Sequence, residues 1–338
     1  MMHRWNHHIG RACTSIGYIA IGVLLSIGAS RHSGAQALSS VPGAFVDIGI
    51  GARAAASGYT GIASERGASA MAWNPASLVS DQGMEIVFSY VDQLGLVEFG
   101  HVAWAMPLRS GRSAWGLAAQ VNGDDMLREM TLQAAYSHRI RFLWLGLSVG
   151  YRMAEFGNNT LSADDYPVFD PDEIAVGLNR QVRGDAQGFM LDAGLRLEMT
   201  HRLDMAVAVR NAYAPVQWTS DAPSREGRKR YFESVPVEVS TGVAYRMSDR
   251  LSGYLDWTPG LASDAIPRVG IGVSYRPLDE IVFRVGRLMV HDRRRDEWRT
   301  FGFGIRTPSA LDWSIEADYA IVVSELARTQ QITLRFGL

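Results

Sequence analysis

Four histidines follow residue 37, and histidine is the side chain best suited to acid–base or metal chemistry near neutral pH. None of them belongs to an H-E-x-x-H motif or stands close to another histidine in the sequence. A serine hydrolase would need a base within hydrogen-bonding reach of its nucleophile, and the sequence assigns no such pair. We therefore predict a protein that is not an enzyme and has no metal site and no cofactor. The histidines are His101, His138, His201 and His291.

Acidic side chains gather in a long connection that we place at residues 154–186. Oxygen ligands of this kind can bind calcium, so the segment is a candidate cation site. Its spacing lacks the EF-hand pattern, however, and we favour solvated surface charge over a calcium site. The acidic residues are Asp164, Asp165, Asp170, Asp172 and Glu173.

Basic side chains gather in two later connections, where they could meet lipid phosphates or acidic partners, or simply be solvated. Over the whole chain, 33 basic residues oppose 35 acidic ones, giving a formal net charge of −2. This balance argues against nucleic-acid binding. The basic clusters are Arg225, Arg228, Lys229 and Arg230, and Arg293, Arg294 and Arg295.

Residues 1–37 are typical of a secretory signal peptide. Two arginines lie in its polar opening, an apolar run follows over residues 16–25, and Ala35 and Ala37 supply the small residues that a signal peptidase reads. Cleavage after Ala37 would also remove Cys13, the only cysteine of the chain. The exported protein would then have no disulfide and no cysteine metal site.

From about residue 84 to the last residue, apolar side chains alternate with small or polar ones. In residues 268–276, Val269, Ile271 and Val273 share one face, while arginine, glycine and serine occupy the other. Successive side chains of a strand point to opposite faces, so each such segment predicts a strand. Fourteen segments begin near residues 84, 96, 113, 128, 142, 187, 203, 237, 250, 267, 280, 298, 312 and 330.

A soluble sandwich and a transmembrane barrel both contain many alternating strands. The barrel is favoured here by strands of about 9–11 residues, an even strand count, short connections that alternate with long ones, and the export signal. Aromatic residues also gather at segment ends, as membrane interfaces require. We predict an all-β transmembrane barrel over residues 84–338 in the bacterial outer membrane, in contact with lipid and lipopolysaccharide. The second strand is irregular, and we expect a bulge near Gly100 and His101.

The polar faces of these strands carry many charges, which in a barrel would point into the lumen. We expect the opposite charges to pair there as a structural network and to restrict what passes. The arginines are Arg196, Arg210, Arg246, Arg268, Arg276, Arg284, Arg306 and Arg335. The acids are Glu85, Asp192, Glu198, Asp204, Glu238, Glu316 and Asp318.

Residues 38–83 precede the strands and do not alternate. The segment is rich in small residues, which permit close packing in a confined space, and Asn74-Pro75 should end a short helix. We predict a plug folded into the lumen, with Asn74 tying it to the wall. A periplasmic extension packed beneath the barrel is the alternative.

Two blocks of this segment resemble the PorV/PorQ family of outer-membrane proteins, which belongs with the FadL-like barrels of fourteen strands. One block is residues 48–54, with Arg53 and the spaced Gly58 and Gly61 after it. The other is residues 68–78, with Trp73, Asn74 and Pro75 at its centre. The family's acidic pair is replaced by Glu65-Arg66, and a serine follows Asn-Pro-Ala where the family has glycine.

The resemblance implies one of two functions. PorV-like proteins are partners of type IX secretion and hold exported proteins at the cell surface, which is the function we predict first. FadL-like proteins carry hydrophobic small molecules across the outer membrane, which is the alternative. Secretion components, exported proteins or a hydrophobic ligand are accordingly the expected partners.

Overall fold

The computed structural model describes residues 45, 49–80, 83–108, 111–124, 126–157, 183–221, 228–260, 267–291, 297–308, 313–325 and 328–338. Sixteen strands in this part of the chain form one antiparallel sheet. They are β1 (Glu85–Gln93), β2 (Val97–Pro107), β3 (Ser113–Gly123), β4 (Leu127–Ile140), β5 (Leu143–Phe156), β6 (Arg183–Thr200), β7 (Leu203–Tyr213), β8 (Pro215–Asp221), β9 (Arg228–Ser234), β10 (Glu238–Arg246), β11 (Leu251–Thr258), β12 (Arg268–Leu278), β13 (Ile281–Val290), β14 (Glu297–Arg306), β15 (Ser314–Val323) and β16 (Arg328–Gly337).

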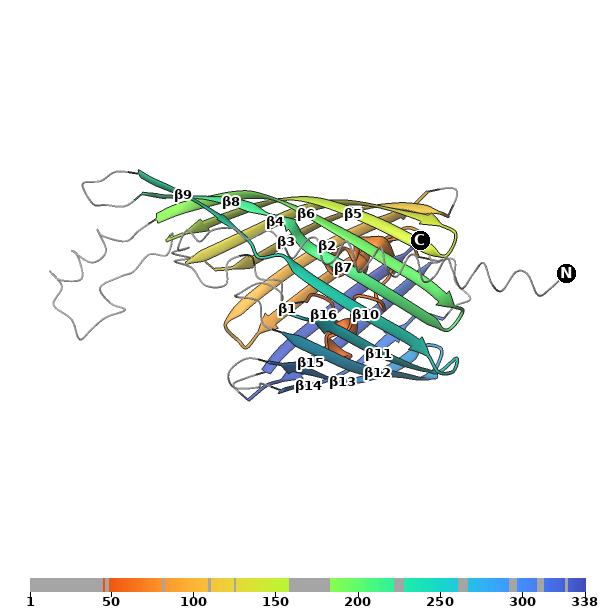
Figure 1. Cartoon of the computed structure of the whole chain (residues 1–338). Helices are drawn as coiled ribbons and strands as arrows, with labels where there is room; N and C mark the ends of the chain where they lie inside the picture. The colour runs from red at the N-terminus through yellow and green to blue at the C-terminus, as the bar shows by residue number, and fades with distance from the viewer. Residues whose placement is uncertain are drawn as a thin grey trace. The chain divides into compact units, whose positions relative to one another are not determined.

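The sheet closes on itself, because β1 pairs with β16 and every other wall strand has two neighbours. Strand β8 prolongs β7, and β9 leads into β10, so that β8 and β9 form a hairpin that projects past the neighbouring strands (Figure 1). The wall therefore has fourteen antiparallel strands, as the sequence predicted. The sequence places the first of the two basic connections, which contains Arg225 and Arg230, at residues 214–236. This prediction was partly wrong, because β8 and β9 lie in that range, and each is only seven residues long.

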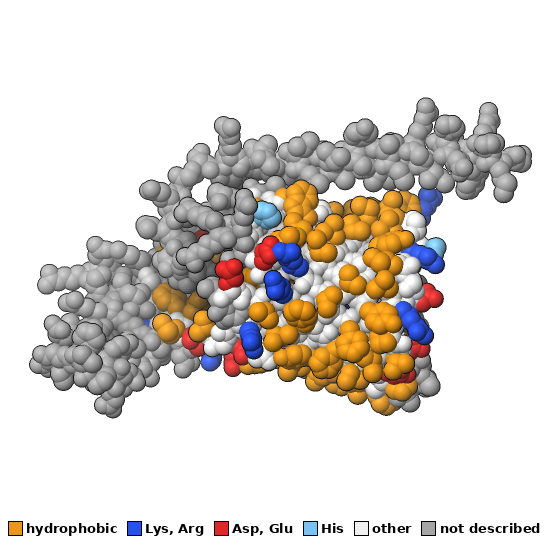
Figure 2. Space-filling model, turned by 90° about the horizontal axis from the view of Figure 1, so that it is seen from below, with side chains coloured by type: hydrophobic (Ala, Val, Ile, Leu, Met, Phe, Trp, Pro, Cys, Tyr) orange, Lys and Arg blue, Asp and Glu red, His pale blue; other side chains and the backbone are white. Residues whose placement is uncertain are grey.

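The outer face of the barrel is apolar. Ile271 and Tyr275 of β12 are exposed, whereas Gly272 between them is buried against the interior. Apolar side chains cover much of the described surface in Figure 2. A closed barrel leaves no unpaired sheet edge in the hydrocarbon layer, and this outer face suits lipid. The protein is thus a barrel of the bacterial outer membrane. Among the described residues, no helix is long and apolar enough to cross a membrane.

Strand β2 is regular, and the predicted bulge near Gly100 and His101 was wrong. The irregular alternation of apolar residues along β2 is explained by packing inside the barrel. Phe99 faces the interior, where it packs with Ile50 and Val91 in an apolar cluster. An apolar residue on the inward face hides the alternation from the sequence.

Residues 49–80, here called the luminal segment, lie inside the barrel (Figure 1). They form the α-helix α2 (Ala52–Ala56) and the 3-10 helices η1 (Gly67–Ala72) and η2 (Pro75–Ser77). Four of the five residues of α2 are alanine, the best helix former, and all four are buried. Helix α2 contacts β13–β16, whereas η2 contacts β4–β6, so the segment spans the lumen from wall to wall.

Several predictions concern residues outside the described part of the chain. These are the cleavage residues Ala35 and Ala37, the acidic residues between 164 and 173, and the basic residues Arg225 and 293–295.

Candidate functional site

Trp73 is the centre of the luminal segment's own packing. Its indole Nε1 donates a hydrogen bond of 2.8 Å to the carbonyl of Ile50, and its side chain is buried. A Cβ on Gly61 would lie 2.0 Å from the indole ring, and one on Gly49 would lie 2.8 Å from it. The glycines therefore make room for the tryptophan, which explains why these residue types occur together.

Asn74 and Pro75 connect the two 3-10 helices. Pro75 begins η2, and the Asn74 carboxamide oxygen caps that helix by accepting from the Ala76 N–H at 3.0 Å. The carboxamide nitrogen lies 3.3 Å from the Leu195 carbonyl of β6 and 3.4 Å from the Val207 carbonyl of β7. Asn74 thus touches both the segment and the wall, and the pair follows the end of η1, as expected.

The luminal segment meets the wall at glycines. A Cβ on Gly272 would lie 2.1 Å from the Ser57 carbonyl oxygen, and one on Gly286 would lie 2.2 Å from the Gly58 nitrogen. On the opposite wall, a Cβ on Gly146 would lie 2.2 Å from the Ala76 nitrogen. Gly58 itself has a φ of +74°, which favours glycine, so the backbones approach closely on both sides.

Buried charges join the segment to β13, β15 and β16. Arg53 donates to Glu316 at 2.6 Å, and Arg284 donates to Asp318 at 2.6 Å. Arg335 lies 3.5 Å from both Glu316 and Glu65. The lumen network that we predicted on Arg284, Arg335, Glu316 and Asp318 is present, and the luminal segment adds Arg53 and Glu65 to it.

Arg53 and Arg66 differ in the balance of forces on their charges. For Arg53, burial is outweighed by the carboxylates of Glu316, Glu65 and Asp318, so its pKa is raised well above the usual value. For Arg66, burial outweighs the attraction of Asp204, 2.7 Å away, and its pKa is lowered. Both guanidiniums remain charged at neutral pH.

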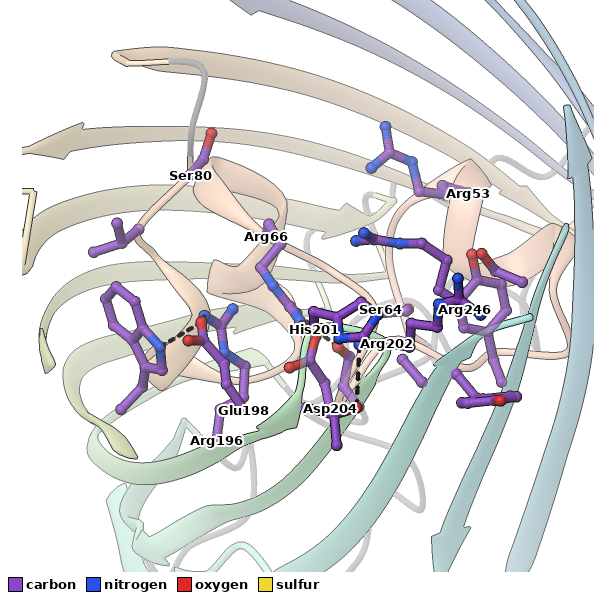
Figure 3. Close-up of a pocket in the computed structure, with 18 of the residues that line it drawn as sticks. Arg53, Ser64, Arg66, Ser80, Arg196, Glu198, His201, Arg202, Asp204 and Arg246 are labelled. Carbon is purple, nitrogen blue, oxygen red and sulfur yellow. Dashed lines mark hydrogen bonds and ion pairs between the residues drawn. The ribbon is translucent and has the colours of Figure 1, made fainter. Parts of the chain in front are cut away.

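A cavity of about 970 Å³, here called the vestibule, occupies the end of the lumen where the connections are short. Its walls are strand ends and turns, and part of its lining comes from the luminal segment, including Arg53, Ser64 and Arg66 (Figure 3). Arg196 and Glu198 of β6 lie on another side, joined at 2.8 Å. Ten arginines and four carboxylates line the vestibule, so it is strongly basic.

The other half of the lumen is narrow and partly apolar. A cavity of about 60 Å³ lies between the luminal segment and strands β2–β7, bordered by Phe45, Met71 and Met190 among polar groups. On the outer face of β2–β6 lies a groove of about 620 Å³ with an almost wholly apolar lining. Ala118 and Gln133 line both spaces, so only one layer of backbone separates them.

The histidines do not gather into a site. His101 is buried beside the narrow cavity, and His201 lies at the vestibule. His138 meets Ser113 at 2.7 Å on the outer face, with no carboxylate in this pair's described hydrogen bonds. In the part of the chain that the structure describes, no three His, Cys, Asp or Glu side chains could hold a metal ion.

Residues 146–150 fit the G-x-S-x-G pattern of serine hydrolases. A nucleophile elbow is a sharp turn from strand to helix. Ser148 instead lies within β5, paired in register with Ala135 of β4 and Asp192 of β6. Its hydroxyl is buried, and no hydrogen-bond partner for it exists among the described residues. The G-x-S-x-G pattern therefore belongs to a regular strand and does not form a nucleophile elbow.

No family model matches the chain, and no curated protein matches it either. Solved structures do. A monoaromatic hydrocarbon channel, CymD, superposes with a TM-score of 0.57 at 14% identity, covering 86% of this chain and 97% of that one. The toluene transporter TbuX of Ralstonia pickettii gives 0.57 at 16% identity, covering 86% and 98%. A Pseudomonas aeruginosa FadL homologue gives 0.55 at 13% identity, covering 84% and 97%. The fold is FadL-like.

Within the FadL-like barrel, the motif residues lie at two kinds of place. Trp73 and Gly61 pack against each other within the luminal segment, whereas Arg53 and Asn74 bond to the wall and Gly58 and Pro75 approach its glycines. The sequence did not reveal the vestibule or the outer groove. The arginines at strand ends carried a signal for the vestibule, since they recur just before the short turns. Membership of the PorV/PorQ family remains a prediction.

Proposed function

We propose that the protein is a transporter of hydrophobic small molecules across the outer membrane. The observation that supports this most directly is the apolar groove on the outer face of β2–β6, back to back with the narrow cavity inside. Lipopolysaccharide retards hydrophobic molecules, so a protein that moves them needs an apolar path beside or through its wall. Solved structures of the same fold include a monoaromatic hydrocarbon channel and a toluene transporter.

Small residues make the groove. Ala119 lies between Val102 and Leu132 across neighbouring strands, and Ala134 lies between Leu117 and Val149. Each alanine leaves a hollow among larger lipid-facing side chains. Inside, Met71 and Met190 border the narrow cavity, and methionine's unbranched side chain adapts to different shapes. In our proposal, cargo enters the groove and crosses at this thin wall.

In our proposal the luminal segment, residues 49–80, acts as the plug of this transporter, and it lies within the boundaries 38–83 that the sequence predicts. The support is its close packing: glycines on opposite walls admit its backbone, and a partly buried ion pair with Glu316 holds Arg53. Such a plug prevents a large aqueous pore, while the narrow cavity beside it, with Met71 and Met190 among polar groups, is the route that we propose for cargo. The signal peptide before it remains a prediction.

Uptake by living cells tests the proposal. A bacterial strain without its own transporter of this class should take up radiolabelled toluene or oleate faster when it expresses the protein. Ala134→Phe fills the groove and should return uptake to the level of the empty strain. Ala317→Phe is the matched control, because Ala317 faces outward on β15, far around the wall. Wild-type protein that accelerates uptake of neither probe would exclude this function.

A second candidate is the secretion-associated or surface-attachment role of PorV-like proteins. The observation that favours it is the hairpin of β8 and β9, which projects past the wall (Figure 1). Aromatic side chains on it and at its base are exposed. Tyr213 at its base is 65% exposed and Phe232 is 76% exposed. Affinity capture from native membranes should then recover exported proteins with wild type and lose them when both residues are serine.

A further inference from the structure

The vestibule has far more positive than negative charge. Ten arginines face four carboxylates, Glu85, Glu198, Asp204 and Glu316. Figure 3 shows Arg66, Arg196, Arg202 and Arg246 arriving from different elements around one space. Like charges in a concave, low-dielectric site focus a strong potential and attract counter-charge from solution.

The ion pairs of the lumen account for only some of these arginines. Arg66 is paired with Asp204 and Arg196 with Glu198. By contrast, Arg202, Arg246 and Arg276 have no carboxylate within 4.0 Å among the described residues. Their guanidiniums are therefore available for a ligand that enters the vestibule.

These three arginines come from three separate hairpins. Arg202 lies in the turn between β6 and β7, Arg246 ends β10, and Arg276 lies near the end of β12. Arg202 and Arg246 are neighbours, because the Arg246 N–H donates to the Arg202 carbonyl at 2.8 Å, and Arg276 lies two strands farther around the wall. Two neighbouring guanidiniums can grip a single small anion, but three along this arc suit several anionic groups carried on one chain. A volume of about 970 Å³ also exceeds what one small anion fills.

Deeper in the vestibule, two arginines keep spare donors. Arg196 is 3% exposed, and its Nε and Nη1 have no hydrogen-bond acceptor among the described residues; the Nε of buried Arg335 is in the same situation. Arg53, Ser64 and Arg66 of the luminal segment close the inner side of the cavity. The short turns of outer-membrane barrels face the periplasm, so a ligand arrives from that side.

We infer that the vestibule is a docking site for an acidic segment of a periplasmic protein. Guanidinium forks match carboxylates, and a chain with several aspartates or glutamates would reach the rim arginines and the deeper donors together. This inference goes beyond the proposed transport function and does not depend on which cargo the barrel carries.

Peptide binding to the mature full-length protein in nanodiscs of neutral lipid tests the inference. The probe is a fluorescent peptide of alternating glutamate and serine, and its control has glutamine in place of glutamate. Fluorescence anisotropy should show binding of the glutamate peptide alone, weakening as salt is added. The triple variant Arg202→Gln, Arg246→Gln, Arg276→Gln should bind about tenfold more weakly or worse, since three charge-assisted contacts are lost.

A matched triple variant changes three exposed arginines at the opposite end: Arg183→Gln, Arg230→Gln and Arg299→Gln. It should bind the glutamate peptide like wild type. Equal binding of the glutamine peptide, or equal losses in both triple variants, would overturn the inference. Inorganic phosphate that binds more tightly than the peptide would assign the vestibule to a small anion and overturn it as well. Heat-resistant migration on a gel checks that every variant is a folded barrel.

Discussion

The two ends of the lumen differ in chemistry. Toward the long connections, Phe45 packs with Trp218 and Phe156, and Ile50 packs with Phe99. These apolar clusters stand beside polar and charged side chains of both signs, such as Glu129 and Arg152. Toward the short turns lies the arginine-lined vestibule. Between them stands the luminal segment, fixed by glycine contacts and by buried ion pairs.

This difference shows that the barrel is not a uniform pore. Apolar clusters at one end suit hydrophobic molecules arriving from outside, whereas a basic end suits an acidic partner in the periplasm. One chain can serve both if the luminal segment leaves only a narrow route between the two ends. Substitutions of the residues that hold this segment should therefore reduce the difference between the two ends.

The largest effect is expected from Asp318→Asn. The Asp318 side chain is fully buried, and it accepts from Arg284 at 2.6 Å with Arg53 3.9 Å away. Removing one partner of a buried pair leaves an uncompensated charge and costs about 3–5 kcal/mol. We expect the luminal segment to loosen, which should appear as current through single barrels in a planar bilayer where wild type is closed. A variant that conducts no more current than wild type would show that the ion pairs of Asp318 do not hold the luminal segment in place.

A smaller loss is expected from Gly286→Val. The new Cβ would lie 2.2 Å from the Gly58 nitrogen, and backbone cannot move aside as a flexible side chain can. Overpacking costs about 1–3 kcal/mol, and here it should push the luminal segment off the wall. Limited proteolysis should then cut within residues 49–80. Gly100→Val is the control, because the nearest atom to its Cβ would be 4.0 Å away and the site faces lipid. Equal protection of both variants would contradict the close-contact argument.

Asn74→Ala should have an effect of similar or lesser size. It removes the cap on Ala76 and the donors to Leu195 and Val207, and a lost buried partner costs about 1–3 kcal/mol. Because strand pairing holds the wall, the barrel should insert and resist heat as wild type does. The luminal segment should nevertheless become sensitive to protease. If the variant resists protease fully, Asn74 is not a latch between segment and wall.

Sequence alone predicted the wall well, because the wall strands have apolar residues at every second position, where the side chains face lipid. It also placed Arg284, Glu316 and Asp318 on the inward face correctly. It failed where the luminal segment supplies an apolar surface inside the barrel, as at Phe99, where both faces of the strand are apolar and the period is lost.

The candidate site was only partly predictable for a related reason. Trp73 and Asn74 stood out as a motif, yet their partners are backbone carbonyls on Ile50, Leu195 and Val207, and any residue type can supply a carbonyl. The vestibule likewise depends on which strand ends meet in space. Charge counts along the chain, which nearly cancel, conceal an excess of arginine at one end of the lumen.

The smallest effect should come from Arg287→Gln, because Arg287 is the exposed one of two paired arginines on the same strand. Arg284 and Arg287 both lie on β13 and both pair with a carboxylate, but Arg284 is 4% exposed with Asp318 at 0%, whereas Arg287 is 50% exposed with Glu297 at 48%. Water and salt screen the exposed pair, and such pairs contribute about 0–1 kcal/mol. We therefore expect Arg287→Gln to leave the midpoint of unfolding in urea nearly unchanged, while Arg284→Gln lowers it clearly. Comparable shifts in the two variants would mean that burial does not decide which charges hold this barrel together.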